Sequence, residues 1–176
     1  MRTTALLVSV GVLTLVTATA ARAQQEGMKA PVPQNQVVST SPLLLMFKWF
    51  NVDYERKISP TVTLGASGSY LPIGDFDYRR ATAHARYYPQ GAALTGFYVG
   101  GQAGVHRAVV HRARNESDHG VFFGAGADIG YSWLLGSKRN VGVSIGYGAT
   151  RLFGGLLKDQ SFVIPNVRLF NIGIAF

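Results

Sequence analysis

Apolar and polar residues alternate along most of the chain, and the alternation is clearest in its last nine residues. One face of that segment carries Phe170, Ile172, Ile174 and Phe176, and the other carries Leu169, Asn171, Gly173 and Ala175. A period of two places successive side chains on opposite faces of a β-strand. The chain also ends on an aromatic residue, although terminal residues usually lie in water. Both features are typical of a strand in the wall of a membrane barrel.

The same alternation predicts seven clear strands after residue 40. They are expected at about residues 43–57, 61–71, 78–88, 96–107, 121–134, 141–153 and 166–176. Most are close to the roughly 9 to 11 residues that cross a bilayer when tilted. Such a barrel has an even number of strands, so we expect a weak eighth strand within residues 33–40. The first clear strand begins as a nearly continuous apolar run, which leaves open the side to which Lys48 points.

The less apolar face of the strands decides between two all-β architectures. Along the last three strands this face is mostly Gly, Ser, Asn, Asp, Ala and Thr, which are too small to fill a soluble core at native packing density. The bulky face therefore points to lipid, in a transmembrane antiparallel up-and-down β-barrel of about eight strands. The alternative is a soluble β-sandwich, in which that face packs on a second sheet.

Connection lengths and aromatic residues favour the barrel over the sandwich. Long and short connections mostly alternate, as expected if the C-terminus lies on the periplasmic side. That topology gathers aromatic side chains near one rim as a periplasmic aromatic girdle, which a sandwich would not require. Its expected members are Tyr54, Tyr87, Tyr88, Phe97, Tyr131, Trp133 and Phe176.

The first 23 residues have the pattern of a secretory signal peptide. Arg2 precedes an apolar segment at residues 5–16, and an Ala-Arg-Ala site at residues 21–23 predicts cleavage before Gln24. The alternative is an uncleaved anchor, but the apolar segment is shorter than the about 20 residues of a spanning helix. Residues 24–36 are polar and contain prolines, so we expect a flexible lead-in, followed by the barrel at 37–176.

The charge of the chain bears on its partner, and its cysteine content bears on how the fold is stabilised. Without residues 1–23 the chain has 153 of its 176 residues and loses two arginines, so 15 Lys+Arg face 9 Asp+Glu and the net charge is near +6. Export argues against nucleic acid as the acidic partner, and phosphorylated surface lipid fits better. No cysteine is present to form a disulfide, so a closed barrel in lipid is the expected source of stability.

Five charged or titratable residues are predicted to share the lumen. They are Glu55, Arg80, His84, Arg86 and Asp128. An eight-stranded barrel has an interior just wide enough for side chains to fill it, and buried charges must be paired. We therefore expect a structural plug of ion pairs, with a gated polar path for small solutes as the alternative.

A second cluster is expected in an external loop at residues 108–119 and its flanks. It combines His106, His111 and His119 with a basic cluster of Arg107, Arg112 and Arg114. The arginines repel a cation, so no metal is expected there. Binding of lipopolysaccharide phosphates by the arginines is one interpretation, and an ordinary solvated loop is the other.

Several local patterns resemble small bacterial outer-membrane β-barrel proteins, the class that includes OmpX, OmpA and OmpW. The resemblance covers residues 41–176 and rests on the segments Tyr54-Glu55-Arg56, Arg86-Tyr87-Tyr88-Pro89, Gly96-Phe97-Tyr98-Val99-Gly100 and the ending at Phe176. These patterns look most like a subfamily with no assigned activity. The resemblance implies the barrel fold and an outer-membrane location, and the terminal Phe176 resembles the signal read by the barrel-insertion machinery. A monomer is our default expectation for such a barrel.

The resemblance also offers an enzyme as an alternative, because some outer-membrane barrels modify lipid. The deacylase type resembles a Ser-His-Glu arrangement with a His-x-Ser pair on a late strand, and no histidine here has a serine two positions later. The glycine-rich runs at 100–104 and 124–130 lack the strand-loop-helix context of a phosphate loop. We therefore expect a non-enzymatic protein without a cofactor, with a structural or surface-interaction role through its external loops. A narrow channel and a lipid-modifying enzyme are the alternatives.

Overall fold

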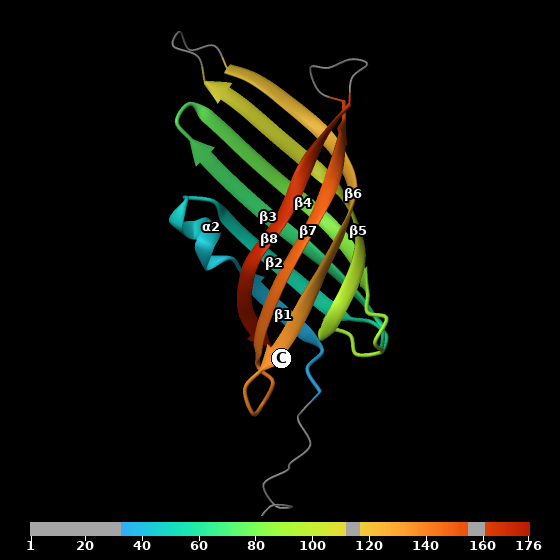
Figure 1. The fold of residues 1–176 in the computed structure, drawn as a ribbon. Coiled ribbons are helices and arrows are strands. Elements are labelled where there is room, and N and C mark those ends of the chain that lie inside the picture. The colour runs from blue at the N-terminus through green and yellow to red at the C-terminus, as the bar shows by residue number, and fades with distance from the viewer. Residues whose placement is uncertain (1–32, 112–116, 155–160) are drawn as a thin grey trace, which may run out of the picture. The chain divides into compact units, whose positions relative to one another are not determined.

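Eight antiparallel strands form a closed barrel in the computed structural model, which describes residues 33–111, 117–154 and 161–176 (Figure 1). Each strand pairs with the next, and the first pairs with the last. The strands are β1 (Gln36–Thr40), β2 (Phe50–Lys57), β3 (Val62–Ile73), β4 (Phe76–Tyr87), β5 (Gly96–His111), β6 (Ser117–Leu135), β7 (Val141–Phe153) and β8 (Phe162–Ala175). The predicted all-β barrel of eight strands is confirmed, and the sandwich is excluded because the strands close on themselves.

The weak first strand closes the barrel against the last one. In β1, Val38 lies opposite Tyr54 of β2 on one side and Ile174 of β8 on the other. The backbone N–H groups of Asn35 and Gln36 donate to the carbonyl oxygen of Phe176, at 3.1 and 2.8 Å. The aromatic end of the chain is therefore held in the wall, at the end of the barrel that we call the terminal end. The opposite end, which carries the β5–β6 and β7–β8 connections, is the loop end.

The expected strand at 43–57 is wrong in its first half. Residues 42–46 form a short helix, α2 (Pro42–Met46), and β2 begins only at Phe50. The side chain of Ser41 accepts the backbone N–H of Leu44 as an N-cap, and Pro42 occupies the first turn, where its missing N–H costs nothing. Lys48 follows in an exposed turn with φ of 58°, so it belongs to neither face of a strand.

A β-bulge changes which residues of β8 face inward. The register between β7 and β8 shifts between Ser144 and Gly146, where one residue of β7 faces two of β8, and the extra residue Phe170 has φ of 43°. Asn171 is buried inside the barrel, whereas Leu169, predicted on the same face, is exposed outside. In the part of β8 that precedes residue 170 in the sequence, the bulge reverses which residues face inward, so that Arg168 points into the lumen.

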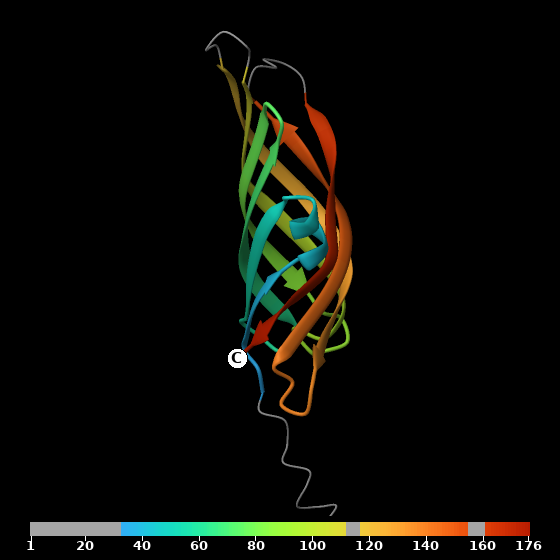
Figure 2. The same ribbon diagram turned by 90° about the vertical axis from the view of Figure 1, so that its left-hand side faces the viewer.

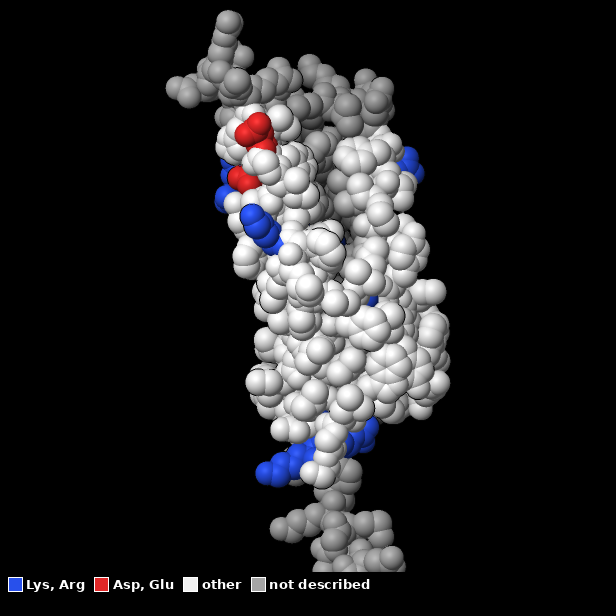
Figure 3. Space-filling model, turned by 60° about the vertical axis from the view of Figure 1, so that its left-hand side comes forward, with Lys and Arg blue, Asp and Glu red and all other residues white. Residues whose placement is uncertain are grey.

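The outer surface of the barrel is apolar on every strand. Its exposed side chains include Val52, Leu64, Val99, Ile129, Ile145 and Ile172, all at least 36% exposed. Figure 3 shows a broad uncharged band on one face, with Lys and Arg gathered below and above it. An apolar band of this extent on a closed barrel is the surface of a membrane-spanning β-barrel. Within the described part of the chain, no helix combines the length and the apolar character that crossing a membrane requires.

Candidate functional site

The interior of the terminal half is organised around one buried guanidinium group. Arg86 points inward from β4 and is only 2% exposed. Its Nη1 atom forms an ion pair with Glu55 of β2 and lies 3.8 Å from Asp53 Oδ1. Its Nε atom lies 3.5 Å from Asp128 Oδ2 on β6. A single arginine therefore connects carboxylates on two other strands of the wall.

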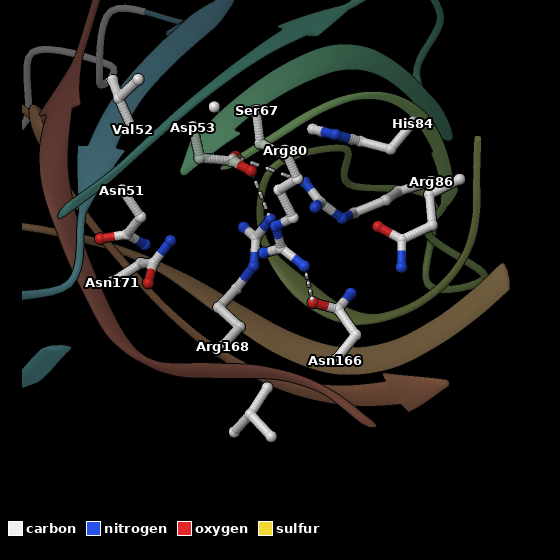
Figure 4. A pocket seen from close by; sticks show the side chains of 13 residues that line it. Asn51, Val52, Asp53, Ser67, Arg80, His84, Arg86, Asn166, Arg168 and Asn171 are labelled. Atoms are coloured by element: carbon white, nitrogen blue, oxygen red, sulfur yellow. Dashed lines mark hydrogen bonds and ion pairs between the residues drawn. The ribbon is translucent and has the colours of Figure 1, made fainter. Parts of the chain in front are cut away.

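A second arginine reaches the same group from β8. Arg168 Nη2 donates to Asp53 Oδ2 at 2.7 Å, and its Nη1 donates to Ser144 Oγ at 3.4 Å. Figure 4 shows the side chains of Arg168 and Asp53 converging inside the barrel. We call the group of Asp53, Glu55, Arg86, Asp128 and Arg168 the charged plug. Buried charges are stable only when they are paired and hydrogen-bonded, and each member here contacts an opposite charge.

Two buried tyrosines complete the plug. Glu55 Oε1 accepts hydrogen bonds from Thr63 Oγ1 at 2.5 Å and from the Tyr88 hydroxyl at 2.7 Å. The ring centroids of Tyr88 and Tyr98 lie 5.7 Å apart, and the guanidinium carbon of Arg86 lies 5.0 Å from the Tyr98 centroid. Tyr88 is fully buried, so its expected place in the aromatic girdle is wrong. It follows Arg86 by two positions and shares its inward face.

Glycines on the inner face make room for these large side chains. A Cβ atom added at Gly130 or Gly146 would meet the Tyr98 hydroxyl, and one added at Gly100 would meet Asp128 and Arg86. The plug therefore depends on glycine at the positions that oppose it.

The remaining space in the terminal half is too small for solutes. Two small cavities of about 30 and 20 Å³ lie there, the first a polar one lined by Asp53 and Arg168, and the second a more apolar one lined by Glu55, Tyr88 and Leu94. Spaces of this size hold one or two waters. Among the described residues, the inward carboxylates of Asp53, Glu55 and Asp128 form ion pairs with Arg86 and Arg168, and Arg80 takes no part in these pairs.

His84 lies beside the plug and brings a possible donor set for a metal ion. Ligand atoms of Asp53, Glu55 and His84 lie within 4.8 Å of one another, and His84 Nε2 has no hydrogen-bond partner among the described residues. Both carboxylates already contact arginines, however, and those positive charges oppose a cation. The arrangement fits an ion-pair network better than a metal centre.

The structure brings all five predicted lumen residues inside the barrel. Arg86 contacts both Glu55 and Asp128. Arg80 lies nearer the loop end and donates to Asn166 Oδ1 at 2.9 Å. Sequence reasoning missed Asp53 and Arg168. Asp53 shares the parity of Glu55 and could have been found, but Arg168 is placed inside by the bulge. Whether the network has a role beyond packing stays a prediction.

The external basic cluster is corrected in part. The expected loop at residues 108–119 is too long, because β5 and β6 continue their pairing to His111 and Ser117, so that Arg107 lies within the paired part of β5. His106 and Arg107 are on opposite faces: His106 is fully buried, with its Nδ1 atom 2.5 Å from the Tyr78 hydroxyl, and Arg107 is exposed. Arg112 and Arg114 are outside the described residues.

The other predicted girdle residues lie on the outside of the terminal half. Phe97 pairs with Tyr131 across β5 and β6, and the ring centroids of Tyr131 and Trp133 are 4.6 Å apart. Tyr54 is half-buried and donates to Gln36 Oε1 at 2.6 Å. Tyr87 and Phe176 are exposed. Their contact with the periplasmic lipid interface stays a prediction.

Comparisons with known proteins place the chain in a family. A family model described as "Protein of unknown function (DUF3575)" matches residues 10–154, so the chain belongs to this family. Comparison with curated proteins found no match.

Two solved structures are similar to this chain. One is the N-terminal β-barrel domain of Pseudomonas aeruginosa OprF, with 12% identity, 81% of this chain and 98% of that chain covered, and a TM-score of 0.47. The other is the Yersinia pestis outer membrane protein Ail, with 15% identity, 81% and 99% coverage, and a TM-score of 0.47. Neither the family description nor these low identities assign an activity.

Proposed function

We propose that the protein is a non-enzymatic β-barrel of the bacterial outer membrane, sealed across its lumen, which serves the cell surface as a structural or interaction protein. The observation that carries this proposal is the burial of Arg86 among three carboxylates that span the lumen. Opening a path for solutes would separate these charges in a region of low dielectric, which is costly. The plug therefore favours a sealed barrel over a narrow channel.

The hydrogen bonds of the inner residues also favour a structural role over catalysis. A nucleophilic serine needs a histidine within hydrogen-bond reach to accept its proton. Among the described residues, the histidine hydrogen bonds go to the Tyr78 hydroxyl and to Asp77 Oδ2. The carboxylates of the plug are engaged by arginine, threonine and tyrosine, which suits them to holding the wall together.

The proposed direction of the chain in the membrane rests on the expected export signal and on the two ends of the barrel. With a cleaved signal at residues 1–23, the terminal end lies in the periplasm and the loop end at the surface. The β5–β6 and β7–β8 connections are then the surface elements through which a partner is met. Lipopolysaccharide is the proposed lipid neighbour, the insertion machinery is the partner during biogenesis, and the barrel is a monomer.

Single-channel recording tests the sealed lumen. The refolded full chain is added to a planar bilayer, and we expect no discrete openings from the natural sequence. Steady openings would contradict the plug and support the channel. Heat-modifiable gel migration of the same sample shows that the barrel is folded.

Incubation with labelled lipopolysaccharide, followed by mass analysis of the lipid, tests the non-enzymatic assignment, which a mass shift of the lipid would contradict.

A further inference from the structure

The wall of the barrel is incomplete in the half nearer the loop end. β8 pairs with β1 only over residues 172–175, so among the described residues its segment 162–171 has no strand partner on that side. β2 begins at Phe50, opposite Tyr70, which leaves residues 71–73 of β3 without a partner on the β2 side. An opening therefore lies between β3 and β8, above the short strand that closes the barrel.

Helix α2 sits at the foot of this opening. Ser41 Oγ donates to the carbonyl oxygen of Leu169 on β8, which ties the start of the helix to the free edge. Figure 2 looks onto this side and shows α2 between β2 and β8. Pro165 lies on the same edge, where a residue without an N–H is tolerated.

The opening faces lipid along most of its height. Arg151 on the outer face of β7 pairs with Val163 and marks the charged rim toward the loop end. The outward residues of the free edge beside the opening are apolar: Val163 is 64% exposed, and Pro165 and Val167 follow it on the same face. Figure 3 shows this side of the barrel hollowed between two ridges in its upper part.

Behind the opening lies an apolar chamber of about 390 Å³, which we call the outer chamber. Its walls are mostly Trp49, Leu71, Phe122, Leu152, Phe162 and Ile164. The volume is within the range of small-molecule sites, and it is more than ten times that of either cavity in the terminal half. An apolar chamber that opens toward a bilayer suits the hydrocarbon chain of a lipid rather than a polar solute.

One positive charge lies at the inner boundary of the outer chamber. Arg80 lines both the chamber and the small polar cavity beneath it, and Figure 4 shows its side chain reaching Asn166. Its Nε atom is buried without a partner, and no carboxylate of the described residues lies within 4.0 Å of its guanidinium. The other two inward arginines are paired directly with carboxylates, so Arg80 is the one with room for an external anion.

We propose that the outer chamber binds a single-chain amphiphile with an anionic head, of the long-chain fatty acid class. The carboxylate is held by Arg80, and the alkyl chain lies against the apolar walls. The opening between β3 and β8 gives access from the surrounding lipid. This site lies on the loop-end side of the plug and needs no passage through it, so it is independent of whether the terminal half is sealed.

The two tryptophans of the chain allow a direct test. Trp49 lines the outer chamber, with its Nε1 atom donating to Ser69 Oγ at 2.5 Å, whereas Trp133 lies on the outside of the terminal half. In the Trp133→Phe variant of the full chain, refolded into phospholipid nanodiscs, fluorescence reports on Trp49 alone. We expect a brominated fatty acid to quench it saturably, and the brominated alcohol of equal length to do so at least tenfold more weakly.

Neighbouring arginines on opposite faces provide a matched control. Arg80→Gln should weaken the saturable quenching by at least tenfold, whereas Arg79→Gln, which removes an exposed charge on the outer face, should leave it unchanged. Ala108→Phe fills the chamber from β5 with Arg80 intact, and should also abolish binding. Heat-modifiable migration confirms that each variant is folded. Equal quenching by acid and alcohol, or in Arg80→Gln and its parent, would overturn the proposal, because the probe would then only be partitioning into the bilayer.

Discussion

Arg86 on β4 and Glu55 on β2 form a buried ion pair across β3, the strand that lies between theirs in the wall. The pair forms because β3 presents small residues on its inner face at this height. Thr63 itself donates to Glu55, and Gly65, which stands opposite Glu55, leaves space that His84 enters from the next strand. The inner surface of the wall is thus shaped to let charges on alternate strands meet.

Removing the central cation should destabilise the barrel severely. In Arg86→Met, three buried carboxylates lose their shared partner, and breaking a buried pair in this way costs about 3–5 kcal/mol. Urea titration of the protein refolded into lipid vesicles measures the free energy of unfolding. Arg107→Met, on the exposed outer face of β5, is the control and should change it by less than about 1 kcal/mol. Equal effects of the two substitutions would show that the plug does not stabilise the fold.

The two buried tyrosines, Tyr88 and Tyr98, should respond differently to loss of the hydroxyl. Tyr88→Phe removes a hydrogen bond to the Glu55 carboxylate and should cost about 1.5–3 kcal/mol, the range for hydrogen bonds to charged groups. Tyr98→Phe removes a hydroxyl that is buried without a partner among the described residues, so it should be neutral or slightly stabilising. The same urea titration compares them. A larger loss of unfolding free energy in Tyr98→Phe than in Tyr88→Phe would contradict this prediction, because it would mean that the Tyr98 hydroxyl forms the stronger hydrogen bond.

Glycines of the inner face should be less replaceable than glycines of the outer face. A Cβ at Gly130 would meet both the Tyr98 ring and the carbonyl oxygen of Ile145, so Gly130→Ala should cost about 1–3 kcal/mol through overpacking. At Gly68 a Cβ would meet only Val52 Cγ1, at 3.8 Å, so Gly68→Ala should be tolerated. Folding yield and unfolding free energy in vesicles check both. A tolerated Gly130→Ala would mean that Tyr98 can move aside without loss.

Alternation along the strands predicted much of this fold, and its failures have local causes. Period two placed Glu55, Arg86 and Asp128 on inner faces, because pleating alone decides the side of a strand on which a residue lies. The helix at Pro42–Met46 was missed because its apolar run is too short to show a helical period, although the Ser41-Pro42 pair is a start signal for a helix.

The partners within the lumen could be predicted only where parity was enough. Asp53 has the parity of Glu55, so the pattern was sufficient to find it. Arg168 was hidden because the bulge at Phe170 reverses the alternation in β8, and nothing in an alternating pattern marks an inserted residue. The outer chamber depends on where β1 ends and β8 continues unpaired, which is a property of register rather than of composition.

Charged substitutions on the outer face should reveal the depth of the wall in the membrane. Ile129 and Leu135 both point outward from β6, at 52% and 48% exposure, but Leu135 ends the strand and Ile129 lies about 20 Å further along it. Ile129→Arg should therefore cost about 2–4 kcal/mol near the bilayer midplane, and Leu135→Arg about 0–1 kcal/mol near the interface. Urea titration in phospholipid vesicles measures both, and refolding in short-chain detergent should narrow the difference. Small and equal costs of the two substitutions in vesicles would mean that Ile129 meets water rather than lipid. A larger cost at Ile129 than at Leu135 would show which height of the wall lies in the bilayer, and therefore at which height the opening between β3 and β8 meets lipid.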